Sequence, residues 1–165
     1  MAILVNKKGH VFLDFLKVSE EEIMKYVNDA PLTHSLVVAS YQGNFLLLFN
    51  KWRKYWELPG GMIDEGETPR ECALRELYEE TNQRIDNIKF KGLMKFQLKP
   101  DDRMEYGALY SGVISDLKPF NENDEAEQLI LWNQVTDIGY IDEIDEKLLD
   151  YYSDDFSSCT SRPLF

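Results

Sequence analysis

The sequence has few cysteines, no long apolar run and few basic residues for its acidic content. Its two cysteines, Cys72 and Cys159, are too few for a disulfide framework, so we expect a reduced, cytoplasmic protein. No apolar run is long enough to span a bilayer, and the N-terminus lacks the apolar region and cleavage site of a signal peptide. With 18 Lys and Arg against 30 Asp and Glu, the net charge is −12. Neither nucleic acid nor an anionic membrane is therefore an expected partner.

The apolar pattern predicts a chain rich in strands. Residues 32–41 and 45–50 predict two strands joined by a Gln-Gly-Asn turn, and the FLLLF run in the second favours a central place in the sheet. Further apolar strands are predicted at 88–98, 104–114 and 129–135, and a closing helix at 141–152. The length of 165 residues suits one domain with a substantial core.

The first 31 residues predict an added layer packed on this core. Two short apolar runs, 2–5 and 11–16, flank a polar turn and favour a hairpin. Ser19 and Glu22 form a predicted capping box that starts a helix ending near Asn28. His10, at the hairpin edge, is interpreted as a surface residue. His34 is interpreted as a polar residue at the start of a strand, with contact to the substrate as the alternative.

The stretch of residues 57–83 carries the strongest signal for function. A Pro-Gly-Gly turn and an acidic loop lead into a helix with Thr68 as its cap and Glu71 completing a capping box. Further along, Glu76, Glu79 and Glu80 share one helical face, where like charges repel by roughly 0.2–0.5 kcal/mol per pair. A divalent cation would compensate such a cluster, so the pattern predicts a metal site.

The spacing of these residues resembles the Nudix box of hydrolases that act on nucleoside diphosphates linked to another moiety. Gly61 is followed after five residues by Glu67, and after seven more by Arg75-Glu76, an apolar residue, one further residue and Glu79-Glu80. Trp56 to Gly60 resembles the usual lead-in. After Thr81 the family prefers Gly and an aliphatic residue, where this chain has Asn82 and Gln83. Asn82 can still end the helix in a left-handed conformation, and Ile85 is a replacement for the missing apolar anchor.

The resemblance implies an α/β (α+β) fold, a Nudix-type α/β/α sandwich in which helices flank a mixed β-sheet. The predicted hairpin and helix at the N-terminus are additions to that fold. The chain then divides into an N-terminal addition at 1–31, a Nudix hydrolase domain at 32–153 and a C-terminal tail at 154–165.

The resemblance also implies the roles of individual residues. The implied metal is Mg²⁺, with Mn²⁺ as a substitute, and its ligands would be Glu76, Glu79, Glu80, the Gly60 carbonyl and Glu125, with Glu127 an alternative to Glu125. The implied catalytic residues are Glu76, Glu79 and Arg75. Arg75 would hold a carboxylate, either Glu79 or Glu67, in place. The general base is left open between Glu76 and an acid of the later loop.

A basic run, KWRKY at 51–55, lies just before the Pro-Gly-Gly turn. Because phosphates need nearby cations, Lys51 and Arg53 are predicted to bind substrate, together with Glu57 and Gly61.

The resemblance implies hydrolysis of a nucleotide's pyrophosphate bond, with a nucleoside triphosphate, including an oxidised one, as the leading substrate. ADP-ribose or a nucleotide sugar comes second and an RNA 5′ end third. The competing interpretation is a Nudix module that senses a nucleotide without cleaving it. The added N-terminal layer also favours a homodimer.

Overall fold

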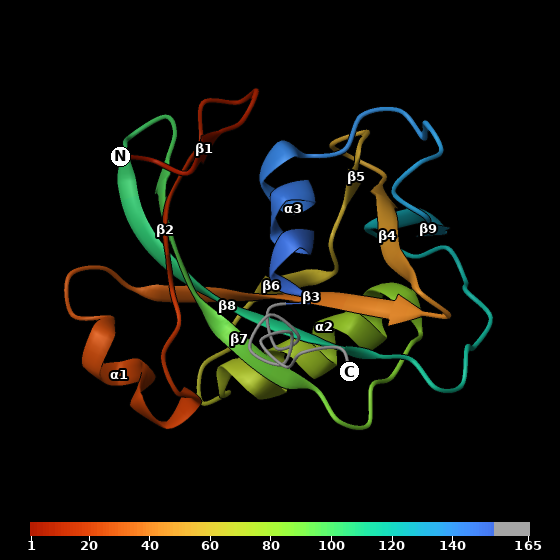
Figure 1. Ribbon diagram of the computed structural model, residues 1–165, viewed down its shortest axis with the longest axis horizontal. Helices are drawn as coiled ribbons and strands as arrows, with labels where there is room; N and C mark the ends of the chain where they lie inside the picture. Colours follow the sequence, from red (N-terminus) through yellow and green to blue (C-terminus); the bar gives the residue numbers. More distant parts are fainter. Residues whose placement is uncertain (154–165) are drawn as a thin grey trace, which may run out of the picture.

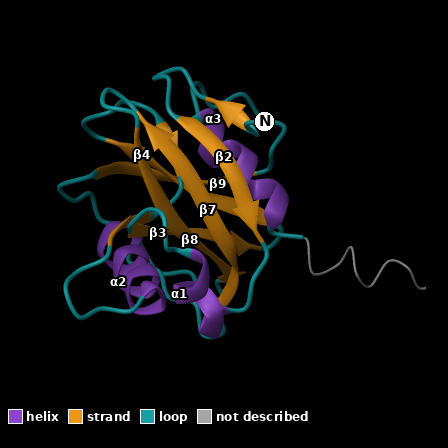
Figure 2. Ribbon diagram, turned by 90° about the vertical axis from the view of Figure 1, so that its left-hand side faces the viewer, coloured by secondary structure: helices purple, strands orange, loops and turns teal. Residues whose placement is uncertain are grey.

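The computed structural model describes residues 1–153 and consists of one mixed β-sheet with helices on both faces (Figures 1 and 2). The predicted tail at 154–165, with Cys159, lies outside the described residues. None of the helices in residues 1–153 has the length and apolar character needed to cross a membrane.

The sheet contains nine strands, seven of them in the order β1-β2-β7-β8-β3-β4-β5. β6 pairs with β3, and β9 pairs with β4. β3 and β8 run parallel, whereas the other strand pairs are antiparallel. The strands are β1 (Leu4–Val5), β2 (Val11–Leu16), β3 (Leu32–Tyr41), β4 (Asn44–Asn50), β5 (Trp56–Glu57), β6 (Gly60–Met62), β7 (Lys89–Leu98), β8 (Arg103–Val113) and β9 (Ala126–Trp132).

Two helices cover opposite faces of this sheet, α2 (Pro69–Thr81) and α3 (Glu143–Leu148) (Figure 2). Successive residues of a strand point to opposite faces. Val37 of β3 accordingly packs with Leu77 of α2, whereas Val38 packs in the cluster that contains Leu148 of α3. The expected arrangement of helices flanking a mixed sheet is confirmed. The remaining helical elements are η1 (Glu20–Glu22), α1 (Ile23–Tyr26) and η2 (Leu149–Tyr151).

The local predictions at the helix ends differ in outcome. Thr68 and Glu71 form the predicted capping box of α2, and Asn82 ends that helix in the left-handed conformation with φ 62°. The prediction for Ser19 is wrong, because its side chain makes no capping hydrogen bond and the helical segment ends at Tyr26. The closing helix begins at Glu143 rather than Ile141 because Asp142, not an earlier residue, accepts hydrogen bonds from the first backbone N–H groups. Strands β5 and β6 were not predicted.

The N-terminal segment joins the sheet through β2, which pairs with β7. Asn6 organises the turn before β2, since its Oδ1 accepts hydrogen bonds from the backbone N–H groups of Lys8 and His10. Its Nδ2 donates to Asp142 at the start of α3, at 3.1 Å. The turn of residues 6–10 is thereby fixed against α3, on the face of the sheet opposite α2.

Candidate active site

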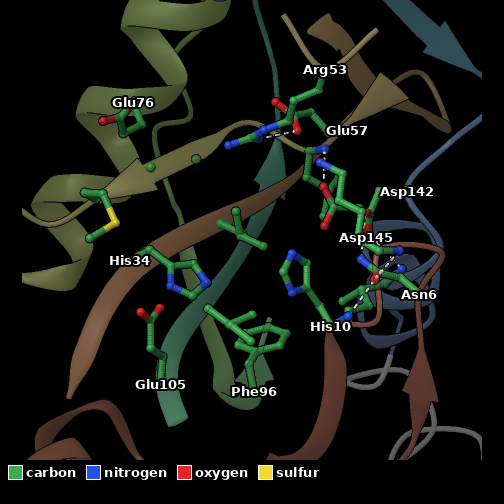
Figure 3. A pocket seen from close by; sticks show the side chains of 18 of the residues that line it. Asn6, His10, His34, Arg53, Glu57, Glu76, Phe96, Glu105, Asp142 and Asp145 are labelled. Atoms are coloured by element: carbon green, nitrogen blue, oxygen red, sulfur yellow. Dashed lines mark hydrogen bonds and ion pairs between the residues drawn. The ribbon is translucent and has the colours of Figure 1, made fainter. Parts of the chain in front are cut away.

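A cavity of about 660 Å³ lies between the β1–β2 turn, the start of α3 and the Pro-Gly-Gly segment (Figure 3). Its lining combines apolar side chains of the sheet with clustered acids and a few bases. The lining residues used below are Asn6, His10, His34, Leu36, Arg53, Glu57, Leu58, Gly60, Gly61, Glu76, Phe96, Leu98, Glu105, Glu125, Asp142 and Asp145.

Arg75 holds three of the box glutamates on the α2 side of the cavity. Its guanidinium donates to Glu67 at 2.7 and 2.9 Å, to Glu76 at 2.9 Å and to Glu79 at 3.2 Å. Both partners considered for Arg75 are thus engaged. Arg75 lowers the pKa of Glu67 to about 2, so Glu67 is ionised at neutral pH. One arginine therefore fixes the positions of acids from both the loop and the helix.

Glycine at position 61 lets the backbone come close to Glu76. A Cβ at Gly61 would lie 2.5 Å from the Glu76 carboxyl carbon, so any larger residue would displace that carboxyl from its position. Burial raises the pKa of Glu76, while Arg75 opposes that effect. The Glu76 carboxyl therefore packs against the peptide of the Pro-Gly-Gly segment and lines the cavity.

Glu80 is buried behind the same segment, where its Oε1 accepts a hydrogen bond from the Gly60 N–H at 2.8 Å. Burial and the Glu125 carboxyl beside it raise the pKa of Glu80 to about 10. Two carboxyls are thus brought together from α2 and from the loop before β9, with a proton between them at neutral pH. Glu127, the alternative to Glu125, follows on β9 and does not line the cavity.

The donor set fits a hard divalent cation. In residues 1–153 no group of three or more His, Cys, Asp and Glu side chains is already spaced to hold a metal ion. Arg75 donates to Glu76 and Glu79, and the Gly60 N–H donates to Glu80. Glu80, which is buried, and the exposed Glu125 beside it nevertheless lack a compensating positive charge, and a divalent cation would replace the proton that the two carboxyls hold. Carboxylate and carbonyl oxygens are the ligands that Mg²⁺ prefers.

A second acidic cluster lies at the α3 side of the cavity and contains Glu57, Asp142 and Asp145 (Figure 3). Glu57 accepts hydrogen bonds from Asn50 at 2.7 Å and from Arg53 at 2.8 Å. Asp142 caps α3, and Asp145 accepts from the Leu58 N–H at 2.9 Å. Burial raises the pKa of Asp145, and the neighbouring Asp142 and Glu57 add to the effect.

The structure brings most, but not all, of the predicted site residues to the cavity. Arg53, Glu57, Gly60, Gly61, Glu76 and Glu125 line it. Glu79 is exposed beside Arg75, outside the lining. Lys51 also lies outside it, where its side chain pairs with Glu122 at 2.7 Å and its N–H donates to the Glu125 carbonyl. In this position Lys51 supports the loop that carries Glu125.

Several lining residues escaped prediction because distant segments supply them. His10 and His34, interpreted as surface and strand-end residues, both line the cavity, as do Phe96 and the acids at the start of α3. The strand alternation of β3 and β7 indicates which residues share a face, but not that the β1–β2 turn closes the same cavity.

Cys72 is a fully buried thiol, as expected, and burial raises its pKa to about 11.

Comparisons with known proteins agree with the box. A family model described as the NUDIX domain matches residues 31–152, which confirms the resemblance. The uncharacterized Nudix hydrolase YvcI of Bacillus subtilis is 32% identical over 94 residues, 56% of this chain and 60% of YvcI. An RNA pyrophosphohydrolase of Cereibacter sphaeroides is 57% identical over 35 residues, 21% of this chain and 22% of that protein. The putative 8-oxo-dGTP diphosphatase YtkD of Bacillus subtilis is 38% identical over 68 residues, 41% and 42% of the two chains.

Among solved structures, the Bacillus subtilis pyrophosphohydrolase BsRppH superposes with a TM-score of 0.66 at 22% identity, over 84% of this chain and 81% of that one. At 22% identity, this structural similarity shows that the two proteins share a fold and nothing further.

Proposed function

Because this chain belongs to the NUDIX family, we propose that it hydrolyses the pyrophosphate bond of a nucleoside triphosphate, releasing a monophosphate and pyrophosphate. The observation that carries the proposal is the position of Glu76 and Glu125 at one end of a cavity large enough for a nucleotide, with the buried Glu80 beside Glu125 but outside the lining. The opposite part of the cavity has an apolar lining from Leu36, Phe96 and Leu98.

A divalent metal is part of this proposal. Glu76, Glu80, Glu125 and the Gly60 carbonyl would hold it, with Glu79 as a further ligand after it leaves Arg75. When bound, Mg²⁺ would withdraw charge from the phosphate oxygens and lower the pKa of a water molecule.

The residues of the chain would position the reactants and move one proton. Arg53 donates from one nitrogen to Glu57, and its remaining N–H groups would bind a phosphate. Arg75 would hold Glu76 in place, and Glu76 or Glu125 would accept the proton of the attacking water. The water oxygen forms a bond to phosphorus as the bond to the bridging oxygen breaks, so pyrophosphate leaves with the electron pair.

The similarity to the putative 8-oxo-dGTP diphosphatase YtkD supports a nucleoside triphosphate, including an oxidised purine, as the substrate. A phosphate-release assay with Mg²⁺ and a panel of nucleoside triphosphates, their 8-oxo forms, ADP-ribose and nucleotide sugars tests the choice. We expect triphosphates to have the highest kcat/KM. Faster cleavage of ADP-ribose would reassign the substrate, and thermal stabilisation by nucleotide without any cleavage would favour a sensing module.

Glu76→Gln tests the site itself, because it keeps the size of the side chain and removes its charge. Its cleavage rate should fall by about 10²–10⁴-fold if Glu76 acts as base or ligand. Val135→Ala, which changes a largely exposed side chain outside the cavity, is a suitable control. Unchanged activity of Glu76→Gln would reject the proposed site.

A second candidate substrate is a triphosphorylated RNA 5′ end, because 35 residues are 57% identical to an RNA pyrophosphohydrolase. The net charge of −12 opposes binding of a polyanion. A 5′-triphosphorylated oligonucleotide in the same panel decides between the candidates, since an RNA enzyme should prefer it to the mononucleotide.

A further inference from the structure

Both histidines of the chain line the same cavity, although they come from different elements and from different parts of the sequence. His10 immediately precedes β2, and His34 lies on β3. Figure 3 shows their rings directed into the cavity, with Phe96 beside them. The His34 and Phe96 ring centroids are 5.5 Å apart. The matched family segment begins at residue 31, so His10 comes from the part of the chain that precedes it.

Hydrogen bonding determines which nitrogen of His34 carries the proton. The Thr33 hydroxyl donates its single proton to the Glu105 carboxylate at 2.8 Å. The same oxygen lies 2.9 Å from His34 Nδ1, so it must accept a proton from that nitrogen. His34 is therefore the Nδ1–H tautomer, and its Nε2 is an acceptor. Burial lowers the pKa of His34 to about 4, in agreement with a neutral ring.

His10 has the opposite tautomer. Its Nδ1 accepts a hydrogen bond from the Lys99 backbone N–H at 3.0 Å, so the proton of the neutral ring is on Nε2. Burial and the charge of Lys8 lower the pKa of His10, which again favours the neutral ring. His10 therefore offers a donor where His34 offers an acceptor.

Neither Nε2 atom has a hydrogen-bond partner within residues 1–153. In that part of the chain no buried polar side-chain atom lacks a partner, so both Nε2 atoms are accessible to solvent. The glycine at position 107 makes room for the His34 ring, because a Cβ there would lie 2.6 Å from its Nε2. The Nε2–Cε1 edge of the ring thus lies near Gly107 of β8, where the side chain also lines the cavity.

We propose that His10 and His34 recognise the base of the nucleotide, with His10 Nε2–H donating to a ring or carbonyl acceptor and His34 Nε2 accepting from an N–H group. Phe96 and Leu36 supply the apolar surface against which a flat heterocycle packs. Two neutral imidazoles suit a base better than a phosphate, which requires cations. This inference rests on the proposed function and names two specificity-determining residues for it.

Thr33 acts through His34 in this arrangement and is a positioning residue. Thr33→Val keeps the shape of the side chain but removes the hydroxyl that accepts the Nδ1 proton. Thr33→Ser keeps the hydroxyl and should restore the behaviour of the natural protein.

The first experiment reads the tautomers directly. With only two histidines, long-range proton–nitrogen NMR spectra of the ¹⁵N-labelled full chain give two separate imidazole patterns. We expect one Nδ1–H ring, assigned through its loss in His34→Phe, and one Nε2–H ring, lost in His10→Phe. Thr33→Val should weaken the preference of His34, and Thr33→Ser should retain it. Two rings of the same tautomer would overturn the inference.

The second experiment separates base recognition from phosphate binding. The probes are an α,β-methylene nucleoside triphosphate, which is not cleaved at that link, and inorganic tripolyphosphate, which has no base, both with Mg²⁺. His34→Phe and His10→Phe should each lower the affinity for the nucleotide by about tenfold relative to that for tripolyphosphate, since one hydrogen bond contributes roughly this much. Met24→Ala, an exposed residue on α1, should keep the natural ratio.

Different results would contradict base recognition by the histidines and the proposed hydrolysis of nucleotides. If the histidine variants weaken both probes equally, or neither, base recognition by these rings is wrong, while metal-dependent cleavage of nucleotides stays unaffected. If the natural protein binds tripolyphosphate but shows no added affinity for the nucleotide, base recognition is also overturned. If it cleaves no member of the substrate panel, the proposed function fails instead.

Discussion

The two ends of the cavity both contain clustered carboxyls, yet their surroundings differ. On the α2 side, Glu80 and Glu125 face each other without a basic residue between them, and burial with mutual repulsion raises the pKa of Glu80 to about 10. On the α3 side, Glu57 is paired with Arg53 and Asn50, and Asp142 accepts from Asn6 and from the backbone of α3.

The difference shows that a concentration of acids does not by itself indicate a metal site. What distinguishes the two clusters is a basic side chain within the α3 cluster, where the Arg53 guanidinium donates to Glu57. Asn6 and backbone N–H groups satisfy Asp142, although burial and the neighbouring acids still raise the pKa of Asp145. The α2 cluster leaves one carboxyl pair to be neutralised by a proton or a cation, so we assign the metal to that end.

The largest expected effect comes from replacing one acid at each end of the cavity by the corresponding amide. Glu80→Gln should lower kcat/KM by about 100-fold or more, because it removes a proposed metal ligand while keeping the Gly60 hydrogen bond. Asp145→Asn, its counterpart at the α3 end, should cost less than about tenfold. Steady-state kinetics with Mg²⁺ measure both. Equal losses would remove the distinction between the two clusters.

The two arginines should differ in the kinetic parameter that they control. Arg75→Lys loses the planar fork that joins Glu67, Glu76 and Glu79, and should lower kcat by about 10–100-fold, as for other residues that orient metal ligands. Arg53→Lys should instead raise KM for a triphosphate by about tenfold with a smaller change in kcat. A lower kcat in Arg53→Lys and a higher KM in Arg75→Lys would contradict the roles assigned to the two arginines.

The α3 cluster should matter more for stability than for chemistry. Asp142→Ala removes the cap of α3 and the partner of Asn6, and should lower the free energy of unfolding by about 1–3 kcal/mol. Urea denaturation measures this. Asp150→Ala breaks an exposed pair with Lys147 and should change it by less than about 1 kcal/mol. A loss as small in Asp142→Ala would contradict a structural role for this end.

The last effect concerns the pH dependence of stability and lies between the two ends, at His34. Its pKa is lowered from 6.5 to about 4 in the folded protein, so the unfolded chain binds one more proton between these values. This contribution to stability is complete above pH 6.5 and is lost as the pH falls toward 4. Thermal melts of His34→Phe should show a weaker pH dependence over this range. An identical dependence in both proteins would contradict the neutral, buried state of the ring.

How much of the site the sequence could predict depends on how its residues are distributed. The α2 side lies within one contiguous stretch, so helical spacing and capping chemistry place Glu67, Arg75 and Glu76 without a structure. The α3 side requires Asn6, Glu57 and Asp142 to meet from three remote segments. No local pattern encodes such a meeting, which depends on the pairing of β2 with β7.

The fold shows the same division. The long strands were predicted within a few residues because their apolar runs are continuous. β5 and β6 were missed because two or three residues of mixed polarity carry no period, and only their partners in β4 and β3 make them strands. The length of the N-terminal helix was overestimated because Ser19 is a residue type that often caps helices, whereas its side chain makes no capping hydrogen bond here.

The two positions at which the box departs from its family pattern have a mechanical consequence. The Gln83 amide exchanges two hydrogen bonds with the Lys118 backbone, at 2.7 and 2.9 Å, and Asn82 donates to the Pro119 carbonyl. Farther along, the Asn123 amide donates to the Glu80 carbonyl. The segment that delivers Glu125 is thus clamped to the helix end at both of its extremities. We expect the residues between the clamps, apart from Glu122 with its partner Lys51, to tolerate change without moving the acid, so insertions there would offer a route to new substrate contacts that spares the chemistry.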